Sequence, residues 1–171
     1  MPARMGRATP RRAGSVLATT HALRAIAGGL CAVLLACGPP EPEPVVLNVD
    51  ACDFCRMTIS DSRFGGEVIM TTGRVHKFDA IECLAGFVRS AKPGSVRTAY
   101  VIDTQHPGTF IAAGSAGFLK GGFLRSPMGR SIVAFATPAA AEEQRAMLGG
   151  TPLSWAGVRA DSTAPAPGVA R

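Results

Sequence analysis

The sequence has little of what marks several common functional classes. It contains one Trp and one Tyr among 171 residues and shows no basic stripe interleaved with aromatic residues, so we predict no nucleic-acid partner. It also lacks a Walker loop, a dinucleotide-binding glycine fingerprint and a nucleophile elbow. These absences leave nucleotide-dependent and hydrolytic catalysis without support, and we expect no small-molecule substrate.

Acidic residues are missing from the first part of the chain. Residues 1–36 carry five Arg, no Asp and no Glu, and they end in the apolar run 25–36, which has secretory length but is short for a membrane span. We predict a lipoprotein signal peptide over residues 1–36. Because five of the 18 Lys and Arg leave with it and none of the 12 acidic residues does, the remaining chain is nearly neutral. The high isoelectric point is therefore mostly a targeting signal.

A cysteine follows this apolar run directly. The sequence Leu34-Leu35-Ala36-Cys37 looks like a bacterial lipobox, in which the cysteine carries the lipid. We predict that Cys37 is a lipid anchor and that the chain is held on a membrane of the bacterial cell envelope, facing the periplasm or the cell exterior. We expect residues 37–48 to be a lipidated Cys and Pro-rich tether, residues 49–156 to be the folded domain, and residues 157–171 to be a disordered tail.

Three cysteines remain once the predicted leader and anchor are set aside. They are Cys52, Cys55 and Cys83. Three is an odd number for a disulfide framework in an oxidising compartment, so at least one thiol is expected to be free or bound to something.

The stretch Cys52-Asp53-Phe54-Cys55-Arg56-Met57 places two thiols and a thioether within six residues. Thiolate and thioether ligands favour Cu(I), whereas zinc sites and redox Cys-x-x-Cys motifs make no use of methionine. The alternative is that Met57 packs in the core while Cys52 and Cys55 form a redox pair or a structural disulfide. The spacing alone leaves both readings open.

Other potential metal ligands are scattered along the chain. A Cys₃His zinc site from Cys52, Cys55, Cys83 and His76 is chemically sensible, but His76 and Cys83 are not a closely spaced ligand pair. Cys83 lies beside the apolar stripe of a predicted helix, where a buried, inert thiol is expected. Met128 lies in a loop with glycines near both ends, where a methionine has less reason to exist for packing alone.

The patterning of residues 67–103 predicts a β-β-α-β unit. Residues 67–71 and 74–78 are β-prone runs around the turn dipeptide Thr72-Gly73. Asp79 is placed to cap a helix from Ala80 that has apolar residues at i, i+3, i+4 and i+7, and a further strand follows at 98–103.

The second half looks like a weaker copy of the first. Its β-prone runs are 109–111, 116–119 and 131–135, and Thr137-Pro138 is expected to start an alanine-rich helix. Trp155 is expected to begin or lie in a last strand. The fold class predicted is α+β, built from two small β-β-α-β units.

Three motifs in this order resemble the NosL family of nitrous oxide reductase accessory lipoproteins. They are Cys52-x-x-Cys55-x-Met57, the hairpin end Lys77-Phe78-Asp79, and Lys120-Gly121 followed by Met128-Gly129-Arg130-Ser131. The resemblance covers roughly residues 52–150. It implies a fold of two β-β-α-β units related to the organomercurial lyases and a membrane-anchored Cu(I) carrier that is not an enzyme.

The resemblance also implies ligands, cofactor and partner. The metal ligands would be Cys55, Met57, Cys52, Met128 and His76, binding Cu(I). The partner would be a copper-receiving enzyme or its assembly machinery, nitrous oxide reductase above all, which places the chain in denitrification. The alternatives are a thiol-active enzyme, either a disulfide oxidoreductase or a lyase-like enzyme, and a zinc-stabilised structural adaptor.

Overall fold

The computed structural model describes residues 40–161. The predicted signal peptide and Cys37 lie outside the described residues. The elements in chain order are β1 (Gly66–Met70), β2 (Val75–Phe78), α2 (Ile81–Ser90), β3 (Val96–Ile102), β4 (Phe110–Ala112), β5 (Gly117–Lys120), β6 (Ile132–Phe135), α3 (Pro138–Leu148), β7 (Thr151–Leu153) and α4 (Trp155–Asp161). No helix among these residues is long and apolar enough to cross a membrane.

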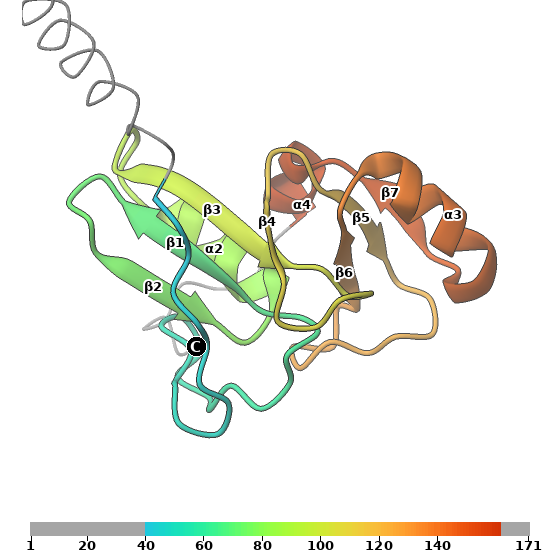
Figure 1. Ribbon diagram of the computed structural model, residues 1–171. Helices are drawn as coiled ribbons and strands as arrows, with labels where there is room; N and C mark the ends of the chain where they lie inside the picture. The colour runs from blue at the N-terminus through green and yellow to red at the C-terminus, as the bar shows by residue number, and fades with distance from the viewer. Residues whose placement is uncertain (1–39, 162–171) are drawn as a thin grey trace, which may run out of the picture. The chain divides into compact units, whose positions relative to one another are not determined.

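The first β-β-α-β unit forms an antiparallel sheet in the order β2-β1-β3-β4, with α2 packed on it (Figure 1). The β1–β2 hairpin turns at Gly73, whose φ of 85° is costly for other residues. Strand and helix approach closely at Gly66, where an added Cβ would lie 2.5 Å from Leu84 Cδ1. The hairpin and the apolar stripe of α2 are therefore confirmed.

The second β-β-α-β unit is a sheet in the order β6-β5-β7 that contacts α3. Thr137 caps α3 as expected, since its side chain accepts a hydrogen bond from the Ala140 N–H, and Pro138 is the first helical residue. The strand expected at 109–111 exists as β4, but it pairs with β3 in the first sheet. With that reassignment, the predicted fold of two β-β-α-β units is confirmed.

The two units share a hydrophobic core. Val68, Phe78 and Leu84 from the first unit belong to the same buried cluster as Phe118 and Ile132 from the second. A smaller cluster lies between β5, β6 and α3. Burial of these side chains stabilises both units together, because neither encloses this cluster alone.

Residues 40–48 do not form the free tether that their proline content predicts. The Tyr100 hydroxyl donates to the Pro40 carbonyl at 2.9 Å, the Glu43 N–H donates to the Glu67 carboxylate at 2.9 Å, and Lys77 Nζ donates to the Pro44 carbonyl at 2.8 Å. Figure 1 shows this segment crossing the first sheet. The tether prediction is wrong from Pro40 onward, because polar side chains of the sheet bind the backbone of the segment.

The end of the domain also differs from expectation. Residues 157–161, predicted as disordered tail, belong to α4, and Trp155 begins this helix instead of lying in a strand. The Trp155 ring stacks on Phe118 with centroids 5.9 Å apart, Val158 is buried, and Asp161 accepts a hydrogen bond from Lys120 Nζ at 2.7 Å. These tertiary contacts stabilise a helix that composition does not indicate; residues 162–171 lie outside the described residues.

Candidate metal centre

The Cys52–Met57 stretch is a closed loop. An antiparallel bridge between Ala51 and Thr58 brings its ends together, and the Cys52 N–H donates to the Met57 carbonyl at 2.8 Å. The chain reverses through Arg56, which has a φ of 68°, while its N–H donates to the Cys52 carbonyl at 2.9 Å. This closure holds both cysteines on a short, constrained turn.

The side chain of Phe54 packs the Cys52–Met57 loop against α2. Its ring is buried against Gly86, where an added Cβ would lie 2.8 Å from Phe54 Cζ. The Asp53 N–H donates to the Lys77 carbonyl at 2.9 Å, which ties the same loop to β2. The glycine in the helix thus allows the loop to approach the first turns of α2.

Four side chains converge where the loop meets α2. The thiols of Cys52, Cys55 and Cys83 and a carboxylate oxygen of Asp79 all lie within 4.8 Å of one another. Cys52, Cys83 and Asp79 are buried, whereas Cys55 is partly exposed. All three cysteines are free thiols, so the sulfurs are available as ligands.

Hydrogen bonding and burial set the protonation of these thiols. A hydrogen bond from the Cys83 thiol lowers the pKa of Cys52 to about 7, against the opposing effect of burial. The same hydrogen bond, together with burial, raises the pKa of Cys83, and burial raises the pKa of Cys55 to about 11. Cys52 is therefore the thiol that ionises most readily, and a bound metal would have to displace protons from Cys55 and Cys83.

Asp79 serves this site and does not cap the helix. The N-cap of α2 is Ala80 in an extended conformation, with no side-chain cap, so the capping prediction for Asp79 is wrong. Asp79 Oδ1 accepts a hydrogen bond from Cys55 Sγ at 3.4 Å, and its buried Oδ2 has no hydrogen-bond partner in the part of the chain that the structure describes. A buried carboxylate oxygen is costly without a partner, so its position among three sulfurs suits a cation.

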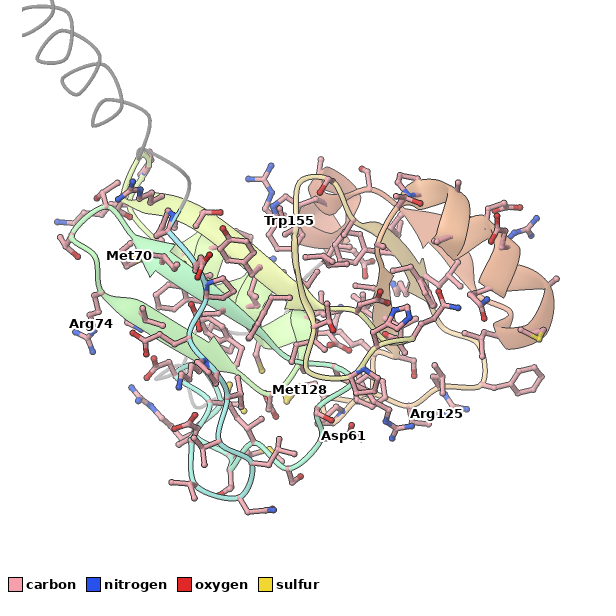
Figure 2. The ribbon with its side chains drawn as sticks, in the orientation of Figure 1. Asp61, Met70, Arg74, Arg125, Met128 and Trp155 are labelled. Atoms are coloured by element: carbon pink, nitrogen blue, oxygen red, sulfur yellow. The ribbon has the colours of Figure 1, made fainter. Side chains whose placement is uncertain are left out.

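The five predicted ligands fall into separate places. Cys52 and Cys55 join the convergent group, while Met57 and Met128 are more open to solvent, at 50% and 36% exposure. In the view of Figure 2, Met128 lies closer to the first unit than Arg125, which belongs to the same loop.

His76 lies outside the convergent group. Its Nδ1 is 2.8 Å from Asp53 Oδ2, and its ring packs on Phe87 with centroids 4.6 Å apart. The convergent group thus contains the three cysteines of the Cys₃His combination considered above, with Asp79 where that combination has His76. His76 as a ligand stays a prediction.

Asp79 is the member of the group that the sequence analysis did not name as a ligand, and Cys83 was considered there only as part of the Cys₃His combination. Cys83 is buried as expected and lies beside Cys52, and whether its thiol is inert or a ligand stays a prediction. The available signal was the spacing of Asp79 and Cys83: residues four apart at the start of a helix can face the same neighbour. The sequence gives no indication that the neighbour is the Cys52–Met57 loop.

This donor set favours a soft or borderline metal ion. Thiolates bind Cu(I) and Zn(II), and a carboxylate oxygen can complete a four-coordinate zinc site. The exposed thioether of Met57, two residues after Cys55, is of use to Cu(I) but not to zinc.

Comparison with known proteins agrees with the fold and the motifs. A family model described as NosL matches residues 45–163. Among solved structures, the copper chaperone NosL from Shewanella denitrificans matches with a TM-score of 0.60 and 25% sequence identity, over 68% of this chain and 94% of that one. A comparison with curated proteins finds no match. The family match spans well over half of the chain, and the chain belongs to the NosL family.

Proposed function

We propose that this protein is a Cu(I)-binding chaperone of the bacterial cell envelope, anchored through Cys37, with no catalytic activity of its own. The observation that carries the proposal is the convergence of three free thiols and an aspartate within 4.8 Å. The similar protein from Shewanella denitrificans is named a copper chaperone, which supports the same role here. The client is a copper enzyme, nitrous oxide reductase.

Release of the metal follows from the exposure of the donors. A carrier needs ligands that a partner's sulfurs can replace one at a time, and Cys55 is the least buried of the three thiols. Met57, half exposed and two residues away, provides a neutral donor that holds the ion weakly during exchange. Transfer would proceed from Cys55 and Met57 to the partner, while buried Cys52 and Cys83 are the last to release.

Competition against a chromophoric Cu(I) chelator tests this proposal, using the full chain purified in detergent, reduced and without oxygen. Wild-type protein should take Cu(I) from the chelator. Cys55→Ser should lower the affinity on the order of 100-fold and Met57→Leu about tenfold, because a charged soft donor contributes more than a neutral one. A parallel Zn(II) titration is the control. Weak Cu(I) binding, or a preference for zinc, would exclude the chaperone role.

The client is tested in cells. Bacteria that lack the chain should accumulate nitrous oxide while producing normal amounts of a copper-deficient reductase, and supplying the chain in trans should restore copper content. The Cys55→Ser variant serves as the matched control, because it should keep the anchor and lose the cargo. Full copper loading in the cells without the chain would remove nitrous oxide reductase as the client.

A thiol-active enzyme is the second candidate, and one observation favours it. The pKa of Cys52 is lowered to about 7, as a nucleophilic thiol requires. Cys52 is, however, buried, which keeps a substrate away from its sulfur. Alkylation of the metal-free protein across pH separates the two: an enzyme should show fast modification of Cys52, and a carrier should show modification of Cys55 first.

A further inference from the structure

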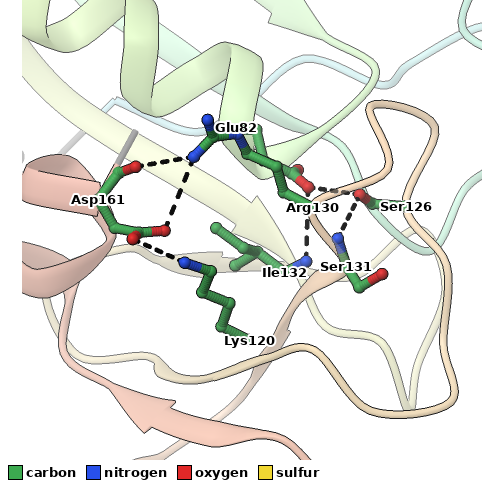
Figure 3. Close-up of polar contacts among 7 residues, drawn as sticks. All are labelled: Glu82, Lys120, Ser126, Arg130, Ser131, Ile132 and Asp161. Atoms are coloured by element: carbon green, nitrogen blue, oxygen red, sulfur yellow. Dashed lines mark hydrogen bonds and ion pairs between the residues drawn. The ribbon is translucent and has the colours of Figure 1, made fainter. Parts of the chain in front are cut away.

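Glu82 is an acidic residue in the interior of the protein. It lies in the first turn of α2 and is fully buried. Its Oε1 accepts a hydrogen bond from the Ser126 hydroxyl and lies 3.5 Å from the Ile132 N–H, as Figure 3 shows. A side chain of the first unit thus binds two points of the second unit, one in the segment that connects β5 to β6 and one at the start of β6.

The segment between those two points is the turn that carries Met128. The Gly129 N–H donates to the Ser126 carbonyl at 2.9 Å, which closes residues 126–129 into a turn. The Ser131 N–H donates to the Ser126 hydroxyl oxygen at 2.9 Å, and Ser131 has a φ of 57°. The Ser126 hydroxyl therefore closes the turn on itself and joins it to Glu82.

The same turn of α2 serves the thiol cluster. Cys83 follows Glu82 directly, and Asp79 comes three residues before it. The cluster and the anchor of the Met128 turn are thus fixed to one another through a few residues of backbone. A second attachment holds the far side of the segment, where Arg130 donates to the Asp161 carbonyl at 2.8 Å (Figure 3).

Packing alone does not explain why a carboxylate occupies position 82. Burying a carboxylate is costly even when it accepts hydrogen bonds, and an apolar side chain of similar size would fill the space at lower cost. What a carboxylate adds is direction, because it binds one hydroxyl in a defined place. Donors placed by outer hydrogen bonds are a recurrent feature of metal sites.

We propose that Glu82 is a positioning residue, which holds the Met128 turn beside the thiol cluster so that the second unit contributes a thioether to a metal bound by the first. This inference rests on the proposed Cu(I) binding. Under this proposal, both β-β-α-β units contribute ligands to the metal site.

A double-mutant cycle tests the proposal in the full chain, with Cu(I) affinity measured by chelator competition. Glu82→Ala and Met128→Leu should each lower the affinity about tenfold, and the double variant should lose no more than either alone. Glu82→Gln keeps an oxygen for the Ser126 hydroxyl and should restore most of the affinity. Glu67→Ala, which removes another fully buried carboxylate without contacts to this segment, is the matched control and should leave the affinity unchanged.

A second measurement needs no metal and keeps the test independent of copper binding. In the metal-free chain, Glu82→Ala should speed hydrogen exchange of the Gly129 and Ser131 amides at least tenfold, with Glu67→Ala leaving them unchanged. Unchanged exchange, or losses of affinity that add in the double variant, would overturn the positioning role. If wild-type protein fails to bind Cu(I) at all, the proposed function falls, whereas the exchange result still decides whether Glu82 holds the turn.

Discussion

Gly86→Ala is the sharpest test of how the cysteine loop is held against α2. Alanine is favoured over glycine inside a helix by about 1 kcal/mol, so the substitution alone should stabilise the protein. The new Cβ would lie 2.8, 3.2 and 3.3 Å from three atoms of the Phe54 ring. Because Phe54 is buried, the ring cannot turn away freely, and overpacking of this kind costs roughly 1–3 kcal/mol. We expect a net loss of about 1 kcal/mol.

The consequence for the site is larger than the consequence for stability. Phe54 lies between Cys52 and Cys55, so a ring pushed off the helix moves both sulfurs away from Cys83. We expect Cu(I) affinity to fall about tenfold, as for other changes that misplace ligands without removing them.

Urea unfolding and chelator competition measure the two effects, and Gly157→Ala is the matched control. Gly157 is also helical, but its nearest contact for an added Cβ is 3.4 Å, so alanine there should raise the free energy of unfolding by about 0.5–1 kcal/mol. Phe54→Leu should partly rescue Gly86→Ala by making room. If Gly86→Ala stabilises the protein as Gly157→Ala does, and copper affinity is unchanged, then the loop is not held by this contact.

Two further predictions concern stability away from the site. Burial raises the pKa of Glu67 to about 7 from an ordinary value of 4.5, so the native state holds this proton more tightly. The free energy of unfolding should then fall by up to about 3 kcal/mol as pH rises from about 4.5 to 7, and Glu67→Gln should remove this pH dependence. Urea titrations at several pH values measure the dependence in both proteins. The same pH dependence in wild type and Glu67→Gln would contradict the prediction. Trp155→Ala should cost about 2 kcal/mol, because it removes the stack on Phe118, and circular dichroism should show it; an unchanged thermal midpoint would mean that α4 contributes little.

Local patterns predict the two units well. The turn at Gly73, the apolar stripe of α2 and the Thr137 cap all depend on residues within a few positions of one another. Local patterns do not predict which strands pair when they are far apart in the sequence. β4 has the composition of a strand in either sheet, and its pairing with β3 is decided by tertiary packing.

Local sequence likewise predicts some residues of the site and not others. Cys52 and Cys55 are predictable because they share one loop, and the thioether of Met57 marks that loop as unusual. Asp79 follows a general rule for helix starts, which fails here because the chain stays extended through Ala80 and leaves the carboxylate to meet Cys55. Cys83 has the pattern of an ordinary core residue, and only the approach of Phe54 to Gly86 brings Cys52 to it.

Three free thiols this close have a consequence for oxidation. Joining Cys52 to Cys83 in a disulfide would release two electrons and two protons and would remove two of the three sulfur donors at once. A metal held by the same sulfurs would occupy the electron pairs that an oxidant needs. The metal-free protein is thus the form more easily oxidised, and bound copper would protect the thiols of the chaperone as well as its cargo.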